Sequence, residues 1–229
     1  MNKYDNYYRI IQFNIKIWLF YTIVTFMPWT LILFLKSDLS NGIFYVLLFS
    51  IIGPVLTVII HEILKFYETD ELEVWRKFSI KNMFKRYIDE FKESFILSLI
   101  SNILIFIWIV DIYYVIKINS NFSIFRFIFL FFIIVSLLLQ FYMLMITAQF
   151  KFKFKDKFKM IFGYLFLKPK VTIINLTTIL LVAIFMILIS NFVLILFLPQ
   201  LLILLVNNSL IIVDDIYENF ILEDDKEVV

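Results

Sequence analysis

The chain has 229 residues, of which 62% are hydrophobic and only 17% charged, and its mean hydropathy is +0.94. Soluble domains are about 45–50% apolar, so this composition excludes an ordinary globular core and indicates that lipid surrounds much of the chain. The net charge is only +2, and the sequence has no cysteine and a single histidine, His61, which excludes thiol catalysis, thiolate metal sites and most histidine-based sites within the chain.

Apolar stretches occur along the whole chain. A helix needs about 20 apolar residues to cross a bilayer. Six stretches meet this requirement: 13–35, 42–64, 95–116, 123–148, 171–190 and 192–213. The last two are separated only by Ser190-Asn191, and Pro199 lies inside the last, so five spans is the alternative. We predict an all-α fold, a single polytopic membrane helical bundle over residues 1–229 with six transmembrane helices and cytoplasmic amphipathic helices.

Positively charged residues are distributed unequally between the two sides of the predicted bundle. With six spans, all but three of the 21 Lys and Arg residues fall on one side, the exceptions being Lys36, Lys117 and Arg126. Cytoplasmic loops carry the excess of Lys and Arg in membrane proteins. We therefore expect a multi-pass protein of the bacterial plasma membrane with both termini cytoplasmic. The cytoplasmic segments would be 65–94, 149–170 and an acidic tail, 214–229.

The second apolar stretch contains the strongest backbone signal, Gly53-Pro54. Proline removes a helix hydrogen bond and clashes with the preceding turn, so a kink is expected there. A static bend and a gating hinge are both compatible with this signal.

The first cytoplasmic segment is amphipathic. Between residues 80 and 95, apolar side chains recur every three or four positions and charged side chains lie off this stripe. This pattern predicts a helix that lies on the inner membrane surface and turns into the third span at Phe95. Alternatively, the stripe is a docking face for a cytoplasmic partner such as a transporter ATPase. The candidate docking residues are Trp75, Phe84, Tyr87 and Phe91.

The second cytoplasmic segment alternates Phe with Lys and then returns to helical spacing. Each lysine near an anionic leaflet contributes about 1 kcal/mol of attraction. We therefore expect lipid anchoring by Lys151, Lys153, Lys155, Lys157 and Lys159. Because the segment is tethered to the membrane, nucleic acid is not expected as its partner.

Ionisable and amide side chains inside spans are costly in lipid, so they are expected to face one another or water. Residues equidistant from a hairpin turn lie at similar depth. This rule predicts three contacts: Lys16–Glu62, Asp111–Arg126 and Asn175–Asn207. The alternative is a solute path lined by Asn102, Asp111, Gln140, Asn175 and Asn207.

Catalytic and cofactor-binding motifs are not found in the sequence. In His61-Glu62, the second histidine of a zinc-binding H-E-x-x-H motif is replaced by Lys65, and three glycines are too few for a phosphate-binding loop. We expect no enzyme, no bound cofactor and no metal site.

Several motifs occur in an informative order along nearly the whole chain. They are Asn14 and Trp18 in the first span, Gly53-Pro54, the run Phe84-Lys85-Arg86-Tyr87, Asp111 in the third span, and Lys168-Pro169-Lys170. In these features the chain resembles the YesL-like family of bacterial integral membrane proteins, a domain of unknown function. Members are often encoded near carbohydrate uptake transporters, so the resemblance implies an accessory role to a carbohydrate ABC-type uptake system. The alternatives are a permease-like ABC subunit and a stand-alone small-solute transporter.

Overall fold

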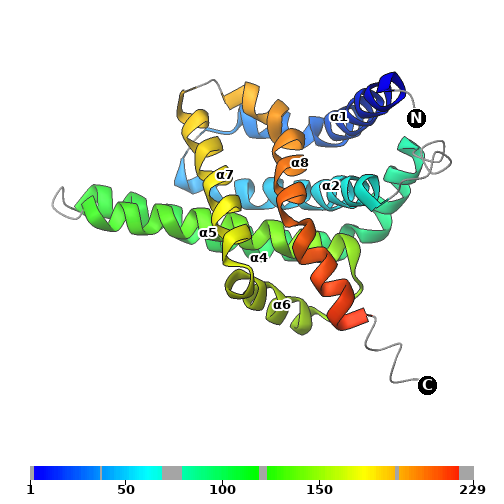
Figure 1. Cartoon of the computed structure of the whole chain (residues 1–229). Coiled ribbons are helices and arrows are strands. Elements are labelled where there is room, and N and C mark those ends of the chain that lie inside the picture. The colour runs from blue at the N-terminus through cyan, green and yellow to red at the C-terminus, as the bar shows by residue number, and fades with distance from the viewer. Residues whose placement is uncertain (1–2, 37, 69–78, 119–122, 189–190, 222–229) are drawn as a thin grey trace.

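The computed structural model describes residues 3–36, 38–68, 79–118, 123–188 and 191–221 (Figure 1). All regular secondary structure in these ranges is helical, which confirms the all-α prediction. The long helices are α1 (Lys3–Phe34), α2 (Gly42–Glu68), α4 (Ile80–Ile118), α5 (Ser123–Gln149), α6 (Phe154–Leu167), α7 (Pro169–Leu188) and α8 (Asn191–Ile216). Two short helical turns, η1 (Leu39–Asn41) and η3 (Tyr217–Ile221), precede α2 and follow α8.

The helices are those of an integral membrane protein. Among the described residues, five helices are long and apolar enough to cross a bilayer: α1, α2, α4, α5 and α8. The number is up to six if α6 and α7, which meet at a bend of 95°, are counted as one broken span. The sequence places the choice between five and six spans at Ser190-Asn191, whereas among the described residues it lies at this bend. Ser190 lies outside the described residues.

Helix α4 differs from the prediction. The amphipathic segment and the third span form one continuous helix of 39 residues, with no turn at Phe95. No Gly or Pro interrupts residues 80–118, so the sequence offers no place for a break. At 1.5 Å per residue the helix is about 58 Å long, roughly twice the thickness of a hydrocarbon core. Part of α4 must therefore extend beyond the bilayer.

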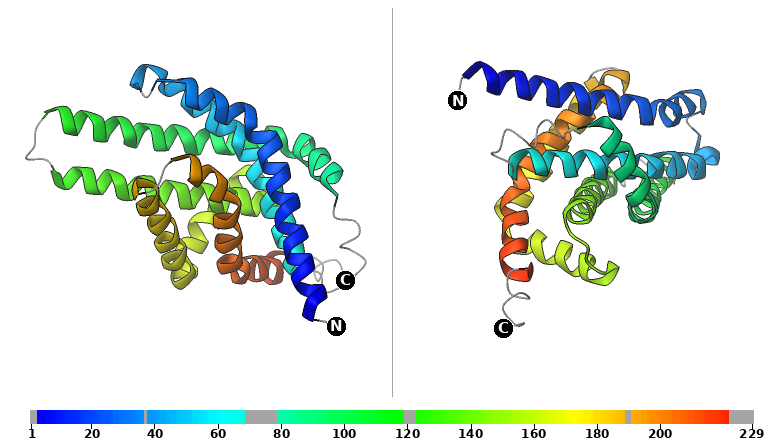
Figure 2. Two further views of the ribbon diagram at one scale, coloured as in Figure 1. Left: turned by 90° about the horizontal axis from the view of Figure 1, so that it is seen from above. Right: turned by 90° about the vertical axis from the view of Figure 1, so that its right-hand side faces the viewer.

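Helices α4 and α5 form a long antiparallel hairpin, and the two helices lie side by side in every view (Figures 1 and 2). Gln140 donates a hydrogen bond of 2.8 Å to the hydroxyl of Ser98. Further along the hairpin, the Trp108 ring stacks on Phe132 with 4.8 Å between centroids. Helices α7 and α8 run across this hairpin in Figure 1.

Helices α2 and α4 approach each other closely at Gly53. A Cβ atom added there would lie 2.4 Å from Cβ of Ser98 and 2.6 Å from its hydroxyl oxygen. Small residues allow membrane helices to pack backbone against backbone, and Gly53 has this function here. Helix α2 remains one helix from Gly42 to Glu68 through Pro54.

The buried core is formed mainly by α1, α2, α5 and α8. Many large apolar side chains point outward from the bundle, including Phe34, Ile43 and Phe127. An exposed apolar surface of this extent is unfavourable in water and favourable in lipid.

Candidate functional site

The segments predicted to be cytoplasmic meet in the structure. Lys157 of α6 forms an ion pair with Glu93 of α4, and Lys168, between α6 and α7, forms one with Asp215 near the end of α8. Residues assigned to one side of the membrane from the charge distribution are therefore in contact with one another.

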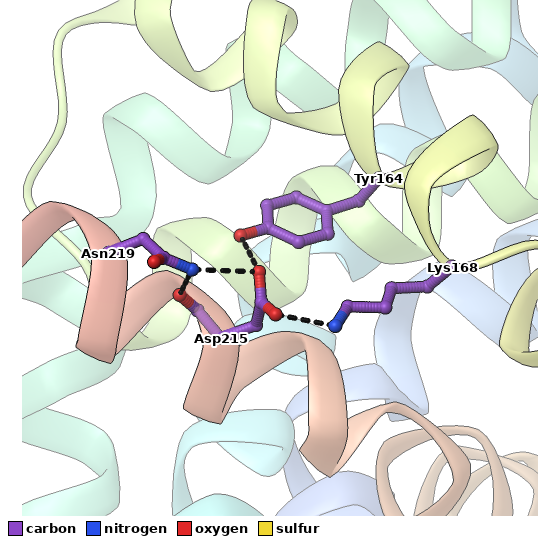
Figure 3. Close-up of polar contacts among 4 residues, drawn as sticks. All are labelled: Tyr164, Lys168, Asp215 and Asn219. Atoms are coloured by element: carbon purple, nitrogen blue, oxygen red, sulfur yellow. Dashed lines mark hydrogen bonds and ion pairs between the residues drawn. The ribbon is translucent and has the colours of Figure 1, made fainter.

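A group of four polar residues links the α6–α7 bend to the end of α8 (Figure 3). We call Tyr164, Lys168, Asp215 and Asn219 the elbow cluster. The Tyr164 hydroxyl donates to Oδ2 of Asp215 at 2.8 Å, and Lys168 Nζ lies 2.5 Å from Oδ1. Asn219 donates to the backbone oxygen of Asp215 at 2.9 Å. Both carboxylate oxygens are thus engaged, and the bend is held against α8.

The elbow cluster also makes the Tyr164 phenol a weaker acid. Burial raises the pKa of the Tyr164 phenol, and the hydrogen bond to Asp215 and the charge of its carboxylate raise it further. The phenol therefore stays protonated and remains the hydrogen-bond donor. The cluster is a structural contact between a cation, an anion and two neutral groups.

Lys157 is not a lipid anchor, contrary to the prediction. Its side chain is only 1% exposed, pairs with Glu93 and donates a hydrogen bond of 3.1 Å to the Thr147 hydroxyl. The reason is helical phase: Lys157, Ile161 and Tyr164 occupy one face of α6, and this face is buried. The other four lysines predicted to anchor the chain are exposed: Lys151, Lys153, Lys155 and Lys159.

Two polar layers cross the bundle between helices. In the first, the Asn102 amide donates to the hydroxyls of Ser50, at 3.1 Å, and Ser98, at 3.3 Å. Gln140 donates to the same Ser98 hydroxyl. This layer joins α2, α4 and α5, and it uses two of the amides predicted to line a solute path.

The second polar layer is centred on Asn175, which is fully buried in α7. Its amide nitrogen donates to the Ser209 hydroxyl at 2.8 Å and to the Tyr142 hydroxyl at 3.3 Å. Asn208 donates to its amide oxygen at 3.2 Å. The predicted contact between α7 and α8 therefore exists, but its partners are Asn208 and Ser209. Asn207, the predicted partner, is exposed.

Neither predicted intramembrane ion pair is found among the described residues, whose ion pairs include Arg86–Glu90, Lys157–Glu93 and Lys168–Asp215. Asp111 and Arg126 do not form one, and Nε of Arg126 is buried without a hydrogen-bond partner. A Lys16–Glu62 ion pair is also not found in the described ranges. The cations that interact electrostatically with buried Glu62 are Lys65 and Arg86. The neighbouring His61 uses Nδ1 to contact the Ala148 carbonyl oxygen at 2.9 Å.

The predicted docking face is mostly occupied within the molecule. Phe84 and Tyr87 pack edge-on against Phe20 of α1, with ring centroids 5.2 and 6.4 Å apart. Phe91 is half-buried and stacks on Phe95. Trp75 lies outside the described residues. The sequence pattern of residues 80–95 could not identify Phe20 as the packing partner, because Phe20 lies in another helix, α1.

No cluster suited to metal binding occurs in the described part of the chain, where no three His, Asp or Glu side chains come together. A small cavity of about 60 Å³ lies between α4, α5 and α6 and is lined mainly by apolar side chains, together with Ser101 and Ser136. Comparison of the chain with protein-family models, curated proteins and solved structures found no match.

Proposed function

We propose that this membrane protein acts through contacts with other membrane proteins and does not carry a solute through its own helix bundle. The observation that carries this proposal is the use of the amide side chains inside the spans. Asn102, Gln140 and Asn175 would be needed to line a polar path, and each is instead hydrogen-bonded between helices. Interhelical hydrogen bonds of this kind hold membrane helices together.

The proposed location is the bacterial plasma membrane, with the α6 end of the molecule in the cytoplasm. The unequal distribution of Lys and Arg supports this orientation, as do the exposed lysines that precede and begin α6. The proposed partners are the ATPase and permease subunits of a carbohydrate ABC-type importer, and the protein would be a non-enzymatic accessory. This partner class depends on the resemblance to the YesL-like family.

The surface available to such a partner lies on the first turns of α4. Ile88 is 72% exposed, and the charged residues Lys85 and Asp89 beside it are exposed as well. An apolar centre with a polar rim is the arrangement found in protein–protein interfaces. With Phe84 and Tyr87 packed on α1, Ile88 becomes the centre of the proposed docking face.

Affinity purification tests this proposal. The tagged protein, extracted from its native membrane in mild detergent, should retain ATPase and sugar-permease subunits. Ile88→Asp should remove them. Ile116→Asp, which changes the same residue type at the opposite end of α4, should not. The proposal is wrong if no subunit is retained and the purified protein alone takes up labelled sugars in proteoliposomes.

A further inference from the structure

Helix α6 carries large apolar side chains on its outward face as well as on its buried face. The buried face holds Lys157, Ile161 and Tyr164, and phenylalanines recur every four residues on the outward face. Phe154 is 45% exposed, Phe162 is 52% exposed and Phe166 is 81% exposed. A surface helix in water turns its apolar stripe toward the core. The arrangement in α6 indicates that its outward face meets an apolar phase.

The rim of this face is cationic. Lys155 and Lys159 lie four residues apart, one helical turn, and border an open groove between them and the phenylalanines. The exposed Lys151 and Lys153 precede the helix. Phenylalanines flanked by lysines are the combination by which an interfacial helix binds an anionic membrane surface.

The inner face of α6 is fixed, which orients the outer face. The Lys157–Glu93 ion pair attaches α6 to α4, and Tyr164 of the elbow cluster attaches it to α8. The helix cannot rotate to bury its phenylalanines without breaking both contacts.

We propose that the outward face of α6 is a binding site for anionic phospholipid. The phenylalanines insert at the boundary between headgroups and acyl chains, and Lys155 and Lys159 bind the headgroup phosphate. Lys157 takes no part in lipid binding. This proposal is independent of the partner assigned under the proposed function.

Native mass spectrometry of the detergent-purified protein, titrated with phosphatidylglycerol and with phosphatidylcholine, tests the site. The wild-type protein should prefer phosphatidylglycerol. Each lysine near an anionic leaflet contributes about fivefold in affinity, so Lys155→Gln with Lys159→Gln should weaken phosphatidylglycerol binding roughly 30-fold. Millimolar inorganic phosphate should not compete with the lipid.

The matched control is a second pair of exposed lysines with the same spacing, Lys81 and Lys85 on α4. Lys81→Gln with Lys85→Gln should leave the preference for phosphatidylglycerol unchanged. Equal losses from both pairs would show that the effect is one of net charge only and would overturn the proposal. Retained preference in the α6 variant would also overturn it.

A second measurement places α6 relative to the bilayer. The chain has no cysteine, so Phe166→Cys gives a single site for a nitroxide spin label. In nanodiscs that contain phosphatidylglycerol, the label should be more accessible to oxygen than to a water-soluble nickel complex. Greater access to the nickel complex would place this face in water and refute the proposal.

Discussion

The Lys157–Glu93 ion pair should respond unequally to the loss of its two members. The side chain of Lys157 is 1% exposed, whereas that of Glu93 is 50% exposed. Glu93→Gln removes the carboxylate that pairs with a buried ammonium group and leaves only neutral oxygens, of the glutamine amide and of Thr147, to accept its hydrogen bonds. Breaking a buried ion pair by removing one partner costs about 3–5 kcal/mol. Lys157→Met keeps the side-chain volume and leaves a carboxylate that water can hydrate, so its cost should be about 1 kcal/mol or less.

Thermal unfolding of the detergent-solubilised protein measures this difference. For a chain of this size, about 1 kcal/mol corresponds to 2–4 °C in Tm. Glu93→Gln should therefore lower Tm by about 6–20 °C, and Lys157→Met by at most about 4 °C. The double variant should behave like Lys157→Met, because it leaves no buried charge. If the two single variants lower Tm equally, the unequal burial of Lys157 and Glu93 does not determine how much each substitution costs.

Two further predictions concern helix packing and the elbow cluster. Gly53→Ala should destabilise the protein by about 1–3 kcal/mol, because the new methyl group meets Cβ of Ser98. The control, Gly163→Ala, should be neutral or stabilising, because its Cβ would have no neighbour closer than 3.9 Å. Equal effects of the two substitutions on Tm would contradict the close approach of α2 and α4. Asp215→Asn removes the charge that pairs with Lys168. It should increase amide hydrogen exchange at the end of α8 and leave exchange in α1 unchanged. Unchanged exchange at the end of α8 would show that the elbow cluster does not hold the bend.

Much of the architecture follows from the sequence because lipid imposes a strong constraint. The apolar runs give the spans, and the Lys and Arg distribution groups segments that the structure brings together through Lys157–Glu93 and Lys168–Asp215. Both properties depend on composition averaged over a segment. They do not require knowledge of which way any single side chain points.

The site residues were harder to predict because they depend on helical phase. The five alternating lysines are equivalent in the sequence pattern, yet once α6 begins at Phe154 only Lys157 of the five turns inward. The predicted partner of Asn175, Asn207, lies one and two positions from the actual partners, Asn208 and Ser209. Each position along α8 turns the side chain by about 100°. Depth matching in a hairpin gives the level of a residue but not its direction.

The polar layer between α2, α4 and α5 bears on how the protein enters the membrane. In lipid, the Asn102 amide has no water to bond, and its partner Ser50 lies one span earlier in the chain. Gln140 then arrives with the following span and bonds the Ser98 hydroxyl. We therefore expect α2 to stay beside the insertion machinery during synthesis until α4 emerges, so that the two helices are released into the bilayer together.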